Sequence, residues 1–545
     1  MAIHSASGGF TRPAQTVTQV GVIPAPLKGV DARVSVVNAP PEVCSYAYNI
    51  MPAEGGMRVR RGFEEFAVIT PISSSEGVRA IVPYTTNGEI GSDDALFAVT
   101  EEGIWNVTAG GSITTRDVAF PSTGVAAGWG VFTSTSTDAG RQILFYADTA
   151  AGNGLWQYDD SDMPGTWVWS KSKFTKPGSN DPEDANNVTF VTIHKQRMWV
   201  FEVDSDTAYY ADTVGGIAGA LEAFYFGGKF KHGGHLSGLY NWTVDGGEGV
   251  DDYLVAVSSS GDVIVYAGSD PSGTDWSTVG TYYIGDVPEG VRVGTEIGGD
   301  LHLLSRFGVV AMSDLIKGVD VKDSSSVTTT YPIAPFIREA MRESANKYGW
   351  GIDYQVGTGS LVINSPTRNN GIDVQYVMTV TTGGWGFWRG VPMLNNESYK
   401  GITYFGTRDN RVMSMDSDTD EGEAIEYSML TSSQNMGSPA VFKRATHVRP
   451  DWRAVESPVY SAKILYDYDI TEIALPKGTP VATGALWDFS IWDIAIWGAG
   501  AVESHHNATG AWGVGRTFAV ALTGKASKPT TLLSFDIMWN TGGVL

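Results

Sequence analysis

The feature that most constrains this chain is a hairpin that recurs about every 51 residues. Each copy reads as a strand, a tight turn and a second strand that starts with apolar or tryptophan residues. The turns fall at Gly103, Gly154, Arg197, Gly261, Gly308, Gly359 and Asn410, with gaps of 51, 43, 64, 47, 51 and 51 residues. Repeats of about 40 to 50 residues are typical of propeller blades, which bury their apolar faces by stacking around an axis. The repeat therefore predicts an all-β protein with a β-propeller of six to eight blades.

The rest of the sequence agrees with many short strands. Glycine makes up 66 of 545 residues and is dispersed, which indicates frequent tight turns. A jelly roll or two stacked sandwiches would give a similar strand density, but neither predicts a steady repeat. Helical periodicity is convincing only once, from Pro335, where Ile337, Ala340, Met341 and Ser344 share one face and Gly349 ends the helix.

The repeat covers only the middle of the chain. Residues 58–424 are expected to form the propeller. Residues 1–57 are expected to form an extended N-terminal arm with one short helix from Pro41 to Tyr48, and arms of this kind usually need a partner to order them. Residues 425–545 are expected to form an additional C-terminal β platform domain, rich in tryptophan at Trp487, Trp492, Trp497, Trp512 and Trp539.

Charge and cysteine content narrow the function classes. The 37 Lys and Arg against 60 Asp and Glu give a formal charge of −23. A negative net charge disfavours binding to nucleic-acid phosphates, because proteins bind phosphate backbones through cationic side chains. The single Cys44 cannot form an internal disulfide, which fits assembly in a reducing compartment. No apolar run is long enough to span a bilayer, and the first residues do not read as a secretory signal.

Metal sites find weak support in the sequence. The acidic run Asp416–Glu423 imitates a calcium loop, but Glu421 and Tyr427 stand where an EF-hand needs glycine and glutamate, so a solvated acidic loop is the better interpretation. His232 and His235, and the adjacent His505 and His506, lack a cysteine or carboxylate at ligand spacing and read as polar loop histidines. No metal or cofactor site is predicted.

Catalytic motifs are equally weak. Ser269–Trp276 approaches the sialidase Asp-box but has Pro271 where aspartate belongs, and Ser161–Trp167 is a looser match; both read as turns between strands. The tryptophans of the segment LWDFSIWDIAIWG are spaced by five, so no single face collects all three. The cluster of Arg58, Arg60 and Arg61 reads as a salt-bridging edge-strand feature. No phosphate loop, dinucleotide fingerprint, nucleophile elbow or zinc-protease helix is present, so no catalytic residue is predicted and the chain is expected not to be an enzyme.

Several segments resemble a family of virion proteins. Pro26–Phe63 is similar to the opening of proteins from tailed phages. Gly233–Pro271, with its continuation through Trp276, Gly285 and the run EIGGDLHLLSRFGVVAMS, is more specific. The segments WGFWRG, YFGTRDNRV and the closing Gly542 and Gly543 are similar to the same family. The family is the tail nozzle, or tail tubular protein B-like, component of short-tailed bacteriophages.

This resemblance implies a structural subunit of the virion tail that is assembled in the host cytoplasm. Six copies would ring a conduit through which DNA passes without specific binding, and the ring would dock the tail adaptor protein and the tail fibres. A ring needs two complementary faces on each subunit. The polar loops Lys171–Val188, Asn364–Gly371 and Asp416–Glu423 are expected to carry these contacts or form a gate. The alternatives are a glycan-binding or glycan-hydrolysing propeller at the host surface, and a propeller scaffold without a virion role.

Overall fold

The structure is a computed structural model that describes residues 18–541, except 71–76, 87–93, 137–141, 160–166, 180–183, 214, 217–218, 246–249, 319–326 and 478–502. The chain divides into two compact units. The propeller unit comprises Arg60–Ile425 with Val30–Arg33, and the sandwich unit comprises the residues up to Gly29, Val34–Val59 and Glu426–Leu545. The expected boundaries at 58 and 424 lie within two residues of this division.

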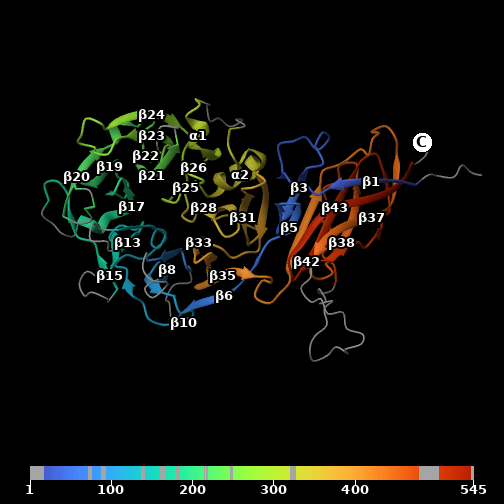
Figure 1. Cartoon of the computed structure of the whole chain (residues 1–545), viewed down its shortest axis with the longest axis horizontal. Coiled ribbons are helices and arrows are strands. Elements are labelled where there is room, and N and C mark those ends of the chain that lie inside the picture. The colour runs from blue at the N-terminus through green and yellow to red at the C-terminus, as the bar shows by residue number, and fades with distance from the viewer. Residues whose placement is uncertain are drawn as a thin grey trace, which may run out of the picture. The chain divides into compact units, whose positions relative to one another are not determined.

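Six separate small sheets and one part of a larger, ten-stranded sheet make up the described part of the propeller unit, so the predicted β-propeller fold is confirmed. We name the blades A to G in chain order (Figure 1). Blade A contains β7 (Ala80–Tyr84), β8 (Ala95–Thr100), β9 (Gly103–Asn106) and β11 (Val118–Ala119); blade B contains β12 (Val131–Ser136), β13 (Gln142–Ala147), β14 (Leu155–Asp159) and β15 (Val168–Lys171); blade C contains β17 (Val188–His194), β18 (Arg197–Glu202), β19 (Thr207–Ala211) and β20 (Gly219–Tyr225), with β16 (Phe174–Thr175) at its edge.

The remaining blades complete the circuit. Blade D contains β21 (Leu236–Asp245), β22 (Val250–Ser258), β23 (Asp262–Ala267) and β24 (Ser277–Tyr283); blade E contains β25 (Gly294–Ile297), β26 (Asp300–Ser305) and β27 (Gly308–Ala311); blade F contains β28 (Gly351–Gln355), β29 (Ser360–Asn364), β31 (Ile372–Thr379) and β32 (Gly384–Arg389), with β30 (Arg368–Asn369); blade G contains β33 (Asn395–Tyr399), β34 (Ile402–Gly406), β35 (Arg411–Ser417), β6 (Gly62–Ile69) and β10 (Gly111–Ile113). The short β2 spans Gly29–Val30.

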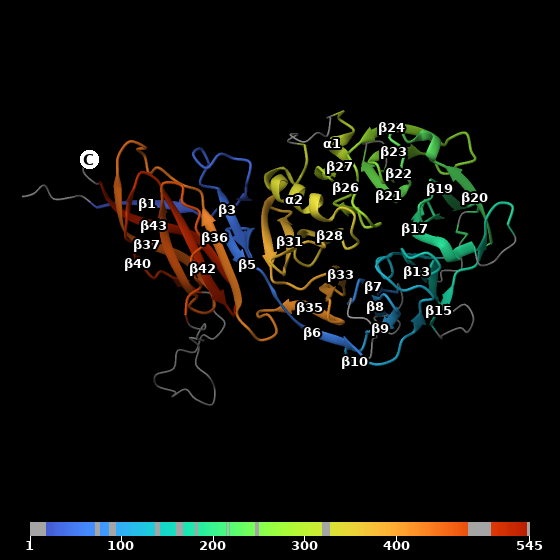
Figure 2. The same ribbon diagram turned by 180° about the vertical axis from the view of Figure 1, so that it is seen from behind.

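Blade G closes the ring by combining the two ends of the propeller sequence. Strand β6 pairs antiparallel with β35, with Ala67 opposite Val412, and the two lie side by side in both views (Figures 1 and 2). Ala67 and Val412 are fully buried in one cluster with Tyr399. The apolar side chains of β6 therefore replace the missing fourth strand of the last blade.

Each of the seven predicted turns lies in a different blade. Five connect the second and third strands, whereas those at Arg197 and Gly359 connect the first and second. The turn at Arg197 lies one hairpin earlier in its blade than the turns at Gly154 and Gly261 do in theirs. The gap before Arg197 is therefore short and the gap after it is long. The turn before Arg197 contains no glycine: Lys195 and Gln196 adopt left-handed φ angles of 46° and 62°, the conformation that a two-residue hairpin of this type requires.

The predicted helix is confirmed as α2 (Ala334–Ser344), with Ile337, Ala340 and Met341 on its buried face. It ends at Ser344, before the expected end at Gly349. At this end of the helix the Ala345 amide donates to the carbonyl of Met341. The other helical elements are α1 (Met312–Leu315), η1 (Asp184–Asn187), η2 (Gly227–Lys229) and η3 (Tyr331–Ile333). Among the described residues, none of the helices has the length and apolar character needed to cross a membrane.

Two sheets pack face to face in the sandwich unit. The first contains β37 (Lys443–Ala454) and β43 (Thr530–Thr541) at its centre, with β1 (Thr18–Pro24), β4 (Ile50–Ala53), β5 (Gly56–Val59), β39 (Glu503–His505), β40 (Thr509–Gly510) and β41 (Val514–Gly515) beside them; the second contains β3 (Val43–Tyr48), β36 (Ile425–Thr431), β42 (Phe518–Ala526) and β38 (Val459–Tyr466). Rings from both sheets meet in the core: Tyr427 lies 5.9 Å from Trp452, and Phe518 lies 6.3 Å from Trp539.

The start of the chain differs from the expected arm. Strand β1 pairs with β43 and β3 pairs with β36, so the described part of residues 1–57 belongs largely to the same unit as the C-terminal strands. The short helix expected from Pro41 to Tyr48 is wrong, because Val43–Tyr48 is a strand. Its valine, cysteine and tyrosines are buried or half-buried against partners almost four hundred residues away, such as Thr431 opposite Cys44. Long-range pairing decides this segment.

Candidate functional site: a polar cavity on the propeller axis

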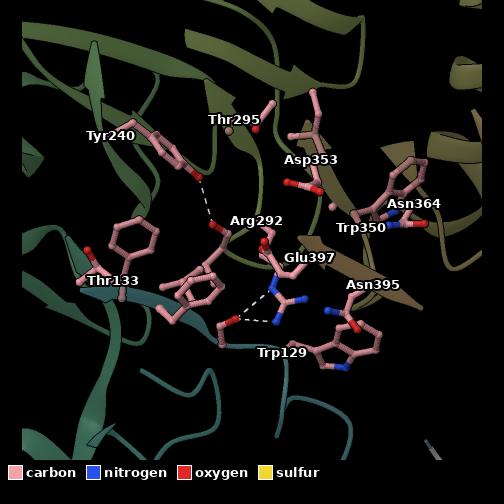
Figure 3. A pocket seen from close by; sticks show the side chains of 18 of the residues that line it. Trp129, Thr133, Tyr240, Arg292, Thr295, Trp350, Asp353, Asn364, Asn395 and Glu397 are labelled. Carbon is pink, nitrogen blue, oxygen red and sulfur yellow. Dashed lines mark hydrogen bonds between the residues drawn. The ribbon is translucent and has the colours of Figure 1, made fainter. Parts of the chain in front are cut away.

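A cavity of about 290 Å³ lies among the inner strands of the propeller. Its walls come from β7, β12, β17, β21, β25, β28 and β33, the first strands of all seven blades, so the cavity lies on the propeller axis. Figure 3 shows Tyr240, Thr295, Asp353 and Glu397 projecting into it. Polar side chains at a place surrounded by apolar blades make this cavity the candidate site.

Arg292 crosses the axis at the edge of the cavity. Its Nε and Nη2 atoms donate to the Gly130 carbonyl, at 2.9 and 2.6 Å (Figure 3). Its Nη1 atom donates to the Arg79 carbonyl at 3.1 Å. Arg292 lies between blades D and E, whereas its acceptors precede blades B and A. Burial lowers the pKa of the guanidinium, and the charges of Tyr146 and Glu397 oppose that shift. The guanidinium remains a cation and ties opposite parts of the ring together.

Two carboxylates face the cavity from neighbouring blades. Asp353 lies on β28 of blade F, and Glu397 lies on β33 of blade G. Burial raises the pKa of Asp353 to about 7, although the charge of Arg292 lowers it in part. Burial, followed by the charge of Asp353, holds the pKa of Glu397 well above its usual value. Both residues are half-buried and border the cavity, so their charge is less well solvated than on an open surface.

An amide network connects the same two blades. Asn396 donates to the Asp353 carboxylate, and Asn364 donates to the Asn396 oxygen at 2.7 Å. The Oδ1 atoms of Asn364 and Asn395 are buried and find no hydrogen-bond partner among the described residues. No side chain in the described ranges hydrogen-bonds or forms an ion pair with Glu397, and a hydrogen bond from the backbone amide of Ser398 only partly opposes the rise in its pKa. The cavity therefore has more hydrogen-bond acceptors than donors to match them.

Sequence reasoning missed this cavity. Of the three polar loops predicted to carry contacts, only Asn364–Gly371 contributes a residue to it: Asn364 ends β29 with its side chain on the cavity wall. The signal that could have found Asp353 and Glu397 is an acidic residue inside the first strand of a blade, in the segments GIDYQ and NNESY. The hairpin repeat alone does not show which face of that strand points to the axis.

The acidic run Asp416–Glu423 is largely exposed, as the sequence predicted, and three of its carboxylates form ion pairs. Arg60, whose side chain is 2% exposed, forms an ion pair with Asp420 at 2.6 Å. Arg61 pairs with Asp416, and Arg411 pairs with Glu421. The salt-bridging interpretation of the basic cluster is therefore confirmed for Arg60 and Arg61. The arginines just before β6 meet carboxylates on and just after β35 because the ring closes through these two strands.

The remaining candidates have local structural roles. His232 and His506 each contact an aspartate at 2.7 Å, Asp262 and Asp451 respectively. Across the described ranges, no group of three or more His, Cys, Asp or Glu side chains is arranged to hold a metal ion. Cys44 is a buried free thiol.

The degenerate Asp-box is a turn between β23 and β24. Ser269 donates to Asp275 at 3.0 Å, and Trp276 stacks against Tyr266 with ring centroids 5.3 Å apart. Most of Ser161–Trp167 lies outside the described residues, as do Trp487, Trp492 and Trp497. Trp512 is 80% exposed and Trp539 is buried. The loop Lys171–Val188 contains β16 and η1, with residues 180–183 outside the described ranges.

Comparisons with known proteins find a structural likeness only. No family model matches the chain, and no curated protein matches it. The crystal structure of BBS1N in complex with ARL6DN matches with a TM-score of 0.27 and 12% identity, covering 47% of this chain and 74% of that chain. The crystal structure of Chaetomium thermophilum Raptor matches with a TM-score of 0.36 and 9% identity, covering 66% of this chain and 29% of that chain.

Proposed function

We propose that this chain is a structural subunit of a short bacteriophage tail, a nozzle protein that assembles into a ring, docks the tail adaptor and fibres, and lets DNA pass. The proposal builds on the resemblance of the segments Pro26–Phe63 and Gly233–Pro271 to that family. The observation that carries it is the charge: a chain at −23 repels phosphates overall, and Arg60, Arg61 and Arg292 are engaged by the chain's own carboxylates or carbonyls.

In this proposal the DNA conduit does not run along the propeller axis. The cavity is about 290 Å³ and Arg292 crosses its edge, so a duplex does not fit along the propeller axis. A channel for DNA would have to lie between subunits of a ring. The propeller would then serve as a wall element, and its virion-tail location and assembly in the host cytoplasm follow from the same proposal.

The test is the mass of the purified chain and its place on the particle. Six copies of a 58.3-kDa chain give about 350 kDa by light scattering, alone or with the adaptor protein. Gold-labelled antibody against the chain should mark the tail tip of virions in electron micrographs. A monomer that stays monomeric with the adaptor, and virions without label, would reject the proposal.

A glycan-directed propeller is the second candidate, and the axial cavity favours it. Paired carboxylates are the catalytic groups of most glycoside hydrolases, and Asp353 and Glu397 share the cavity with Trp129 and Trp350. Its volume is at the low end of ligand pockets, which usually span about 300 to 1,000 Å³. Release of reducing sugar from host polysaccharide, abolished in Glu397→Gln, would establish this function instead of the nozzle.

A further inference from the structure

We infer that the outer face of the first sandwich sheet binds the acidic surface of a second copy of this chain. The inference rests on the proposed ring and identifies one of the two subunit faces that such a ring needs. We call this surface the arginine face. Its principal residues lie on strands β1, β5, β37 and β43: Val20, Val22, Arg58, Arg444, Arg453 and Thr531.

The strand register brings two arginines of this face together. Trp452 and Leu532 stand opposite each other and are fully buried. The adjacent residues of the two strands, Arg453 and Thr531, therefore point away from the core. Arg58 stands opposite Thr531 on its other side, and directly opposite side chains share one face of a sheet. The backbones of Arg58 and Arg453 are thus two strands apart, about 10 Å, so both guanidinium groups can reach a single carboxylate above Thr531.

The arginines of this face outnumber its carboxylates. Arg449 is engaged by both aspartates of the face, Asp536 and, at 3.8 Å, Asp451. The other three arginines are exposed, and their guanidinium groups form no ion pair or hydrogen bond with another described residue: Arg58, Arg444 and Arg453. Their charge is therefore available to the carboxylates of another molecule.

Strand β1 adds apolar side chains and an open edge to the face. Val20 and Val22 are 60% and 61% exposed and stand opposite Met538 and Asp536 of β43. On its other side β1 pairs with no strand in the described ranges, and its sequence TQVGVIP carries no charge. Native proteins usually cover such an edge strand or protect it with charge. Valines beside arginines indicate a protein partner rather than a nucleic acid, because the buried part of a protein interface combines apolar groups with arginine.

Charge complementarity identifies the partner as a second copy. Four arginines against two aspartates give the arginine face a formal charge of +2, so the rest of the chain carries −25. Two arginine faces repel each other, which disfavours a two-fold dimer through this surface. The acidic remainder of another copy attracts the face instead. Such a contact joins two different surfaces, and repeated around an axis it closes a ring.

The test compares self-association of the full chain with that of three single variants. Sedimentation velocity at about 0.05 M salt should show an assembled wild type, which should dissociate at about 0.5 M salt as screening increases. Arg58→Glu and Arg453→Glu should each weaken association at least about tenfold, because each places a carboxylate against the acidic partner. Arg342→Glu, the same charge change at an exposed arginine on α2 of the propeller, should assemble like the wild type.

The alternative outcomes are distinct. Equal assembly by all four proteins would overturn the inference and leave the ring and the tail function standing. A wild type that stays monomeric at low salt would overturn it too, and gold labelling of virions would then decide the tail function separately. Binding of duplex DNA that is lost in Arg58→Glu and Arg453→Glu would assign the face to phosphates and overturn the inference. If these variants fail to fold, wild-type assembly that does not depend on salt overturns it equally.

Discussion

The two units of this protein reach an all-β structure by opposite routes. In the propeller, most sheet partners follow one another in the chain: Ala147 pairs with Leu155 in blade B, eight residues later. In the sandwich unit, Thr18 pairs with Asn540 and Cys44 with Thr431. Local pairs close small loops, whereas distant pairs require closure of loops of hundreds of residues at a higher entropic cost. The propeller can therefore begin to form blade by blade, but the sandwich needs both ends of the chain.

Blade G is the exception within the propeller, and it should be the most sensitive point of the ring. We expect Ala67→Asp on β6 to destabilise the propeller by more than about 4 kcal/mol, because it buries a charge without a partner between β6 and the cluster around Tyr399 and Val412. Urea unfolding measures the loss. Glu64→Gln, an exposed change on the same strand, should leave the midpoint unchanged; equal midpoints for both variants would show that β6 does not close the ring.

Trp452→Ala tests the distant pairing of the sandwich unit. Trp452 is fully buried on β37 and contacts Tyr427 and Tyr460 from the second sheet. Removing a buried tryptophan typically costs about 3 to 5 kcal/mol, and we expect that loss in the free energy of unfolding. Trp512→Ala, which removes an 80% exposed ring, should cost less than about 0.5 kcal/mol. If both variants lose a similar free energy of unfolding, Trp452 is not packed in a core between the two sheets.

This contrast explains how much of the fold the sequence could predict. The hairpins at Gly103, Gly261 and Gly308 were predictable because both strands and the turn lie within one short segment. The strand at Val43–Tyr48 was not, because its partners lie at Ile425–Thr431 and no local pattern distinguishes it from a short helix. Strand β6 was missed as a member of blade G for the same reason.

The candidate site was only partly predictable from the sequence. The sequence shows Asp353 and Glu397 within strand-like segments, and their places in the first strands of blades F and G follow from the repeat. That they share a cavity depends on the packing of neighbouring blades, which brings β28 and β33 together. The path of Arg292 to carbonyls 162 and 213 residues away is set by three-dimensional packing alone.

Arg292→Met measures how strongly opposite sides of the ring depend on one another. The substitution removes donors to the carbonyls of Gly130 and Arg79 and leaves them without these hydrogen bonds, so we expect a loss of about 1 to 3 kcal/mol in urea unfolding. Arg306→Met removes an exposed ion pair with Asp286 and should cost less than about 1 kcal/mol. If Arg292→Met lowers the free energy of unfolding no more than Arg306→Met does, the hydrogen bonds of Arg292 do not help to hold the ring together.

The smallest expected effect is on how the stability of the protein depends on pH. It distinguishes the polar axis of the propeller from the apolar core of the sandwich. The pKa of Asp353 is about 7 in the folded chain and 3.8 as its ordinary value. Between these two pH values Asp353 is protonated in the folded state and ionised in the unfolded state. Protonation of Asp353 therefore contributes its full stabilisation below about pH 4, contributes less as the pH rises to about 7, and contributes nothing above that pH.

Asp353→Asn imitates the protonated carboxyl and keeps an oxygen that can accept from Asn396. In the presence of EDTA, the variant and the wild type should unfold at similar temperatures near pH 4.5, and the variant should become more stable by about 1 kcal/mol near pH 8, a value reduced because the side chain borders a cavity. Calorimetric scans across this range measure the difference. A constant difference at all pH values would mean that Asp353 titrates normally and that the axis is open to water, in which case the propeller interior would resemble a surface rather than the enclosed sandwich core.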